Sequence, residues 1–546
     1  MVKSGNNYLS IPSLLMLAIC SASIFWINFH STLWYEVDIY TYTLEGKHMF
    51  ETRSLFPEGW IFGNQYQIFA SPNMAALFYG ICRDSVTAMS LASSLSLLLV
   101  LASFWWCFRK YVPRGGIAAG LLCIGGGFIF GTNAATYVSG LQVLYTMASF
   151  YACYMIVILL TLGCWLRLKE GSRTPWAMCA VILPLNFLLG MQSPREMLIL
   201  VIPLVIMEGG ELLFRLYKKE PVRRIIENSR AAALVLLVFI AELAGHFYMK
   251  ALDVPSTSII GDLQLDLSLR GLVANIWLAT KNVLRVSGIA IAKDGLKYIP
   301  LSVCALAVAG MVVWSLVSII RRKGFGALAK AVIFSFISVL CVYGIGVFLM
   351  RTRDIYYFVY WLLAALSAVY CLREASGWMR TALLSAVLII CAINYCYTFI
   401  PNFTDYRENK EKLDAFTTRL VNDGIKVIYV DATPLFAANS HDRILSQTFW
   451  LDPGLLSGYP LTVFPSDKYV PAYDEEHYEG ALFCFSNHYL GYLEEAPESY
   501  IEALFENLEP YGEITLGGNK FKFYRSLKRI LNPDFITSPY GESLSD

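Results

Sequence analysis

The sequence predicts an α-helical, polytopic membrane protein with a water-soluble α/β domain at its C-terminal end. Of the 546 residues, 56% are apolar and only 16% are charged, and the apolar residues gather in blocks long enough to cross a bilayer. A soluble domain usually carries about a quarter charged residues, so most of this chain has too few charges for a polar surface. The net charge of +1 gives no sign of a nucleic-acid partner.

The apolar segments predict the number of membrane-spanning helices. A spanning helix needs roughly 20 mostly apolar residues, and we expect about eleven spans. The segment 176–191 is the weakest of them, because it is short and contains Pro184. The first segment is longer than the apolar core of a signal peptide and has no cleavage site of small residues, so we expect it to be retained. The predicted spans are residues 11–30, 87–108, 116–134, 143–166, 176–191, 197–214, 231–250, 299–320, 330–350, 356–372 and 381–399.

The short basic loops predict the orientation of these spans. Lys and Arg cluster after the second, fourth, sixth, eighth and tenth segments, and such clusters stay on the cytoplasmic side. All of them agree if the N-terminus is cytoplasmic. The loops 31–73 and 251–297, of which the second has an amphipathic pattern, are then expected outside. We therefore divide the chain into a membrane domain, 1–400, and an extracytoplasmic domain, 401–546.

The C-terminal segment alternates between helix and strand patterns, which predicts a small α/β domain. Residues 404–423 are charged, with apolar positions at helical spacing, and Gly424 follows as a helix end. Residues 425–430 and 481–485 have the pattern of buried strands, and residues 499–508 that of a helix. Residues 513–516 and 520–524 flank Gly517 and Gly518, which predicts a hairpin.

Two carboxylates, Glu36 and Asp38, stand close together just after the first predicted span. A carboxylate at the membrane surface can take a proton from an acceptor hydroxyl or hold a cation. The alternative is that both are interfacial charges above the helix, and that Trp34, Tyr35 and Tyr40 form an aromatic belt.

Arginines on the same predicted side form a candidate phosphate site. Arg195 precedes the sixth span, and Arg351 and Arg353 precede the tenth. Charges at span entrances are costly unless they are paired or functional, and the fork of an Arg side chain binds phosphate oxygens well. These residues therefore suit a phosphate-bearing lipid donor. The alternative is pairing with Glu196, Asp354 or lipid headgroups.

The triplet Glu36–Val37–Asp38 in the first outer loop, the many spans and the outer C-terminal domain together resemble the GT-C-type glycosyltransferases. This superfamily includes the protein O-mannosyltransferases and the bacterial aminoarabinose transferases. The resemblance implies a polyprenyl-phosphate-linked sugar donor, inversion at the anomeric carbon and transfer to an acceptor hydroxyl. It implies that Asp38 or Glu36 is the general base, with Asp38 favoured. The second carboxylate would orient the acceptor or a divalent cation, Mg²⁺ or Mn²⁺.

The remainder of the first loop and the tail bear on the substrates. Trp60 and Tyr66 could stack on a sugar, and Asn64 and Gln65 could hydrogen-bond its hydroxyls, although an interfacial aromatic loop would have the same composition. The tail has no W-W-D-type motif, so we do not expect an oligosaccharyltransferase. The acceptor can be a glycan, a lipid or a protein. The scattered histidines of the tail offer no metal-binding pattern.

Two other functions compete with sugar transfer. A transporter or flippase of polyprenyl-linked glycans would place charges inside the spans, where few stand apart from Glu242, His246 and Glu208. His246 follows Glu242 by one helical turn, which suits either a proton relay or a buried hydrogen bond. A membrane assembly scaffold would bind its partner through the C-terminal domain.

The cysteines bear on the compartment. Of the 13 cysteines, only Cys484 lies in the polar C-terminal region. We therefore expect small apolar core residues rather than a disulfide framework. This fits a bacterial plasma membrane better than a eukaryotic secretory one.

Overall fold

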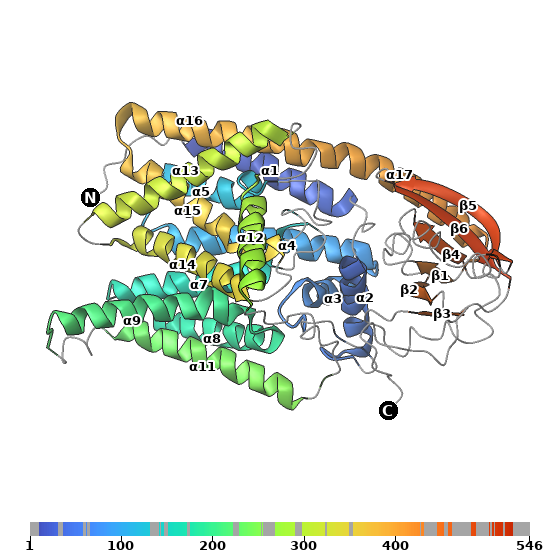
Figure 1. Ribbon diagram of the computed structural model, residues 1–546, viewed down its shortest axis with the longest axis horizontal. Coiled ribbons are helices and arrows are strands. Elements are labelled where there is room, and N and C mark those ends of the chain that lie inside the picture. The colour runs from blue at the N-terminus through green and yellow to red at the C-terminus, as the bar shows by residue number, and fades with distance from the viewer. Residues whose placement is uncertain are drawn as a thin grey trace.

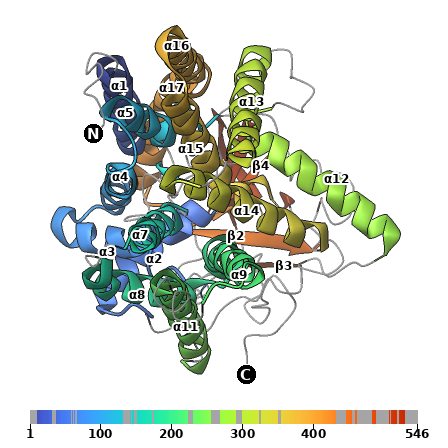
Figure 2. The ribbon, with the colours of Figure 1, turned by 90° about the vertical axis from the view of Figure 1, so that its left-hand side faces the viewer.

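The protein is a bundle of long helices with a small sheet beyond one end (Figure 1). The computed structural model describes residues 10–30, 37–57, 60, 62, 66–130, 141, 144–146, 151–171, 175–221, 229–252, 254, 268–289, 298–322, 325–348, 353–425, 427–430, 445–452, 457–460, 482–486, 502, 505, 506, 508–516 and 519–527. Figure 2 shows many of the long helices nearly end-on.

Nine helices in the described part of the chain are long and apolar enough to cross a membrane, which confirms the predicted polytopic fold. The helix α8 (Pro175–Gln192) has a shorter apolar stretch and contains Pro184. The nine are α1 (Ser10–His30), α4 (Ser85–Phe108), α7 (Ala152–Lys169), η3 with α9 (Met197–Val201, Ile202–Tyr217), α11 (Arg230–Ala251), α13 (Ile299–Arg321), α14 (Ala327–Phe348), η6 with α15 (Asp354–Tyr357, Val359–Glu374) and α16 with η7 (Gly377–Asn394, Tyr395–Phe399).

The predicted span 116–134 does not continue as one helix. Helix α5 (Arg114–Leu122) passes into one π-helical turn, η2 (Cys123–Gly127), and ends there because Gly126 adopts a left-handed φ of 114°. The carbonyls at a buried helix end need donors. The side-chain amide of Asn394 donates to the carbonyl oxygens of Gly126, Gly127 and Ile129 at 2.9, 3.1 and 3.1 Å. An apolar sequence pattern does not distinguish this interruption from a continuous span.

The structure has three shorter helices for which the sequence analysis predicted no helix bounds. Helices α2 (Val37–Thr52) and α3 (Ser71–Cys82) follow α1 and pack on one another and on α4. Helix α12 (Leu269–Val286) runs across the long helices (Figure 1) and has an amphipathic pattern, as expected for the second large loop. Helices α2 and α3 lie at the end of the bundle that faces the sheet.

The C-terminal sheet has six strands in the order β3-β2-β1-β4-β6-β5. Strand β1 is parallel to β2 and β4, while β6 is antiparallel to β4 and β5. The strands β1 and β4 and the β5–β6 hairpin match the predicted strands, whereas β2 and β3 were not predicted. The strands are β1 (Val427–Val430), β2 (Leu445–Asp452), β3 (Ser457–Pro460), β4 (Leu482–Ser486), β5 (Leu508–Leu516) and β6 (Asn519–Ser526).

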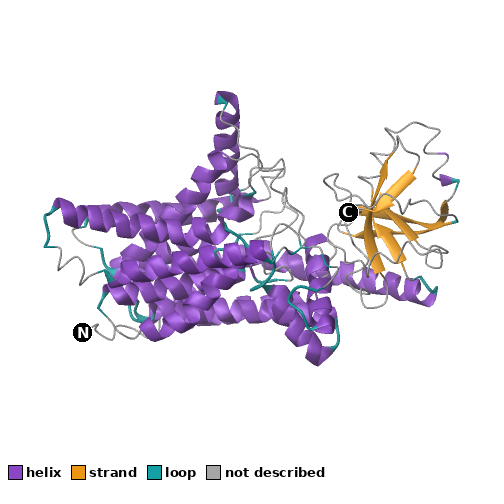
Figure 3. Cartoon of the chain, turned by 90° about the horizontal axis from the view of Figure 1, so that it is seen from below, coloured by secondary structure: helices purple, strands orange, loops and turns teal. Residues whose placement is uncertain are grey.

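One helix, α17 (Ile400–Asn422), joins the bundle to the sheet (Figure 3). It follows η7 directly and packs on the sheet, where the ring centroids of Phe416 and Phe523 lie 4.7 Å apart. Leu413 and Leu420 are buried on the same helix. Gly424 has a φ of 73° and lies just past the helix, as its position in the sequence predicted.

Candidate functional site

Arg195 lies in the short turn between α8 and η3, at the end of the bundle near α2 and α3. Its guanidinium carbon is 5.0 Å from the ring centroid of Tyr151, 6.0 Å from that of Tyr154 and 4.9 Å from that of Tyr356. The first two rings come from the start of α7 and the third from η6. Aromatic faces attract a guanidinium, so two elements, the start of α7 and η6, position this cation.

Arg195 does not pair with its neighbour in sequence, which was the alternative expected for it. Both carboxyl oxygens of Glu196 are buried and lack a hydrogen-bond partner in the described part of the chain. The same holds for Glu242 on α11, so of the two alternatives for the Glu242–His246 pair, the buried hydrogen bond is not formed.

Gln192 ties the first loop to this cluster. Its side-chain oxygen accepts from the backbone N–H of Phe69 at 3.1 Å, and its amide donates to the hydroxyl of Tyr154 at 3.2 Å. Its backbone carbonyl accepts from the N–H of Tyr66 at 3.2 Å. Since Gln192 stands three residues before Arg195, these bonds fix the arginine turn relative to the C-terminal part of the first loop.

Arg353 is exposed at the N-terminal cap of η6, three residues before Tyr356. The charges of Arg353 and Arg195 both act on the phenol group of Tyr151. The structure therefore brings two of the three predicted arginines to one place. Arg351 lies outside the described residues.

Of the carboxylate pair, the structure describes only the backbone of Asp38. Helix α2 begins at Val37, so Asp38 and Tyr40 are in its first turns. The side chains of Asp38 and Tyr40, and all of Tyr35, Glu36, Asn64 and Gln65, lie outside the described residues.

Trp60 and Tyr66 both take part in contacts within the protein. Trp60 is 2% exposed, and its ring centroid lies 5.8 Å from that of His48 on α2. The hydroxyl of Tyr66 donates to the carbonyl of Val254 at 3.1 Å, which connects the first loop to the segment after α11.

Glu45 is a candidate residue that the sequence analysis missed. It lies two helical turns after position 38 on α2, is 2% exposed, and one of its carboxyl oxygens has no hydrogen-bond partner in the described part of the chain. Burial raises the pKa of Glu45 well above its ordinary value. A carboxyl in its protonated form can donate a hydrogen bond. The seven-residue spacing from Asp38 was the signal available in the sequence.

The carboxylates that the resemblance associates with Mg²⁺ or Mn²⁺ are the pair in the first loop. Carboxylate oxygens are the ligands that such ions prefer. Among the residues with described side chains, no three His, Cys, Asp or Glu come together in a way that could hold a metal. The side chains of Glu36 and Asp38 are not among those residues.

Comparison with known proteins gives a match at the level of structure. No protein-family model matches the chain, and no curated protein does. The crystal structure of ArnT from Cupriavidus metallidurans bound to undecaprenyl phosphate matches with a TM-score of 0.57 and 11% identity, over 95% of this chain and 98% of that one. The apo-state structure of the same ArnT gives a TM-score of 0.42 at 12% identity, over 94% and 97%. The chain therefore shares the fold of the ArnT crystal structure, a polytopic helical fold as the sequence predicted.

Proposed function

We propose that this chain is a multi-pass membrane glycosyltransferase, which moves a sugar from a polyprenyl-phosphate-linked donor to an acceptor hydroxyl at the outer face of a bacterial plasma membrane. The fold carries this proposal: the match spans 95% of the chain, and the crystal structure that it matches contains undecaprenyl phosphate. Fold alone does not determine function, so the proposal also rests on the residues at one end of the bundle.

The arginines provide the site for the donor phosphate. Arg195 is held by three tyrosine rings and has no ion pair with Glu196, and Arg353 lies exposed near the same tyrosine cluster. A guanidinium held in place and still charged can bind phosphate oxygens through two parallel hydrogen bonds. Arg351, two residues before Arg353, is the third arginine that we assign to the phosphate.

Asp38 is the general base of the proposed reaction. The acceptor oxygen attacks the anomeric carbon, its proton passes to the Asp38 carboxylate, and the bond between the anomeric carbon and the phosphate oxygen breaks. Attack from the face opposite the leaving polyprenyl phosphate inverts the anomeric centre. Glu36 orients the acceptor hydroxyl, or holds a divalent cation where one is used. We assign contacts with the sugar or the acceptor to Tyr35, Tyr40, Trp60, Asn64, Gln65 and Tyr66.

A flippase or transporter of polyprenyl-linked glycans is the second candidate, and one observation favours it. Glu196 and Glu242 are buried in the bundle without hydrogen-bond partners in the described residues, and intramembrane carboxyls of this kind are common in transport pathways. Scrambling of a fluorescent polyprenyl phosphate glycan in proteoliposomes, lost in the Glu242→Gln variant, would favour transport over transfer.

Lipid binding by the purified full-length protein tests the donor site. Undecaprenyl phosphate is titrated into native protein and an Arg195→Gln variant, and thermal stability is followed. We expect stabilisation of the native protein and an apparent affinity about tenfold weaker or worse in the variant. Arg109→Gln is the matched control. Arg109 also lies over an aromatic ring, with its guanidinium carbon 4.5 Å from the ring centroid of Trp105, but it follows the C-terminal end of α4 and is not part of the arginine cluster. Equal binding by the native protein and Arg195→Gln would contradict this assignment.

A further inference from the structure

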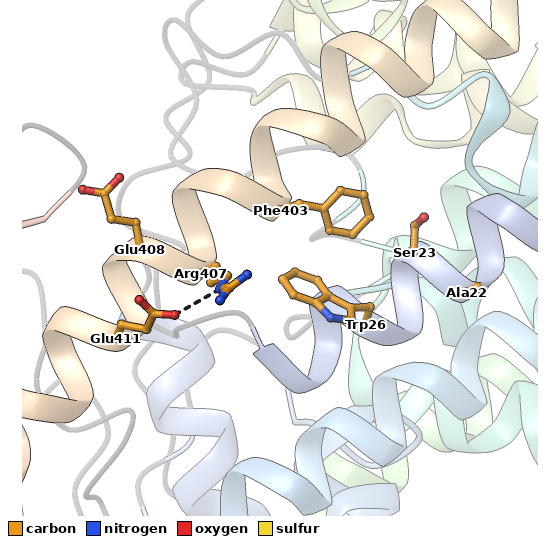
Figure 4. Close-up of a pocket in the computed structure, with 7 residues that line it drawn as sticks. All are labelled: Ala22, Ser23, Trp26, Phe403, Arg407, Glu408 and Glu411. Carbon is orange, nitrogen blue, oxygen red and sulfur yellow. Dashed lines mark hydrogen bonds and ion pairs between the residues drawn. The ribbon is translucent and has the colours of Figure 1, made fainter.

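A groove of about 730 Å³ opens between α1 and α17, and its lining includes neither Arg195 nor Arg353. Figure 4 shows Trp26 and Phe403 pointing toward one another across it, with Arg407 and Glu411 at its far end. The Trp26 and Phe403 rings meet edge to face, with centroids 4.9 Å apart. Ala22, Ser23 and Glu408 complete the lining. The groove therefore has an apolar part and a charged part.

Both helices change from apolar to polar at the level of this groove. Helix α17 continues the spanning helix α16–η7, and its charged residues begin only after Phe403. On α1, Trp26 stacks on the terminal His30 at 4.4 Å. Tryptophans gather where a bilayer meets water. A tryptophan beside a helix that turns from apolar to charged is typical of the headgroup level of a bilayer.

The charged part of the groove contains an ion pair that a ligand can separate. Arg407 Nε lies 3.0 Å from Glu411 Oε1, and these side chains are 73% and 67% exposed. An exposed ion pair contributes little to stability. Opening it to admit a phosphate beside Arg407 and an ammonium group beside Glu411 therefore has a small cost. A guanidinium makes charge-assisted hydrogen bonds with phosphate, and a carboxylate makes them with a primary ammonium.

We propose that the groove between α1 and α17 binds a phospholipid with an ethanolamine headgroup. The phosphate lies against Arg407, the ammonium against Glu411, and the glycerol and upper acyl chains lie along Trp26 and Phe403. This site is separate from the proposed donor site and does not depend on sugar transfer. Its lipid holds α17, and with it the sheet, against α1 at the membrane surface.

Native mass spectrometry of the full-length, delipidated protein tests the proposal. Dioleoyl phosphatidylethanolamine, phosphatidylglycerol and phosphatidylcholine are added singly at equal concentrations to the native protein and to an Arg407→Gln variant. The amount of each lipid that the native protein binds beyond the Arg407→Gln variant measures the lipid held at the groove. We expect this difference to be largest for phosphatidylethanolamine, with an apparent affinity about tenfold weaker in the variant.

Variants on the same helix provide the controls. Lys412→Gln breaks an exposed pair of the same kind, between Lys412 and Glu408 at 2.7 Å, without removing a residue that lines the groove. We expect Lys412→Gln to bind phosphatidylethanolamine like the native protein and Glu411→Gln to lose the preference for it over phosphatidylcholine. An equal difference for all three lipids, or an equal loss of binding in Lys412→Gln and Arg407→Gln, would overturn the proposal.

Discussion

The guanidinium carbon of Arg195 lies 4.9 Å from the ring centroid of Tyr356, although the two residues are far apart in the sequence. Arg195 belongs to the turn between α8 and η3, and Tyr356 belongs to η6 at the start of another spanning segment. The contact thus brings the start of the sixth predicted span and the start of the tenth into one cluster. It gives the proposed donor site a definite geometry that can be tested with single substitutions.

Loss of the Tyr356 ring should weaken binding of the donor phosphate. We expect Tyr356→Leu to bind undecaprenyl phosphate about twofold to thirtyfold more weakly, because a cation–π contact contributes roughly 0.5–2 kcal/mol. Tyr356→Phe keeps the ring and should retain most of the affinity. Thermal-shift titration measures both. Equal losses in the Leu and Phe variants would mean that the hydroxyl, not the aromatic face, positions Arg195.

Gln192 should be important for stability as well as for the site. Gln192→Leu removes the acceptor for the Phe69 N–H and the donor to the Tyr154 hydroxyl. We expect the free energy of unfolding to fall by about 1–3 kcal/mol, which is the usual cost of leaving a buried polar group without its partner. Thermal unfolding in detergent measures this, and a Gln192→Leu variant as stable as the native protein would contradict it.

Glu45 should make stability depend on pH. Its pKa is raised by burial, so the folded state favours the protonated form and loses stability as pH rises above the unfolded pKa, about 4.3. Glu45→Gln cannot ionise, and its stability relative to the native protein should therefore increase from pH 4.5 to pH 8. The increase is about 1.4 kcal/mol for each pH unit up to the folded pKa.

The control for Glu45 is Glu51→Gln, which removes a carboxyl from an exposed position of the same helix. Thermal unfolding of the three proteins is compared across this pH range. A stability difference between Glu45→Gln and the native protein that stays constant with pH would show that Glu45 is not buried as described.

The crossing of α8 and α11 should not tolerate a side chain at Gly190. A methyl group there would lie 2.2 Å from the backbone oxygen of Glu242, which cannot move aside as a flexible side chain could. We expect Gly190→Ala to lower the free energy of unfolding by about 1–3 kcal/mol. Gly209→Ala is the matched control, because nothing lies within 4 Å of its added methyl group. Equal stability of the two variants would argue against this crossing.

The sequence predicted features that depend on local pattern. Apolar blocks located most of the spans, and Gly424 located the end of α17, because burial in a bilayer and a left-handed φ each select residue types directly. It did not predict the end of η2 at Gly126, since the compensating donor is Asn394, more than 260 residues away. Strands β2 and β3 were also missed, although they are neighbours in the sequence and pair with each other.

The candidate site was predicted unevenly for the same reason. Arg195 and Arg353 were selected from their positions at predicted span entrances, and the structure places them around one tyrosine cluster. The tyrosines themselves and the Gln192 bonds were not foreseen, because they depend on how α7, α8 and η6 pack. The roles of Glu36 and Asp38 remain a prediction from the sequence triplet.

The central claim is that the chain transfers sugar from a polyprenyl phosphate with Asp38 as the base. Membrane vesicles with and without the full-length protein are incubated with a panel of undecaprenyl-phosphate hexoses, and release of undecaprenyl phosphate is measured for the native protein and Asp38→Asn. We predict release that requires the protein and falls at least about a hundredfold in Asp38→Asn, while this variant still binds undecaprenyl phosphate. Native release rates in Asp38→Asn would contradict the role of the base, and no release from any donor would contradict the proposed function.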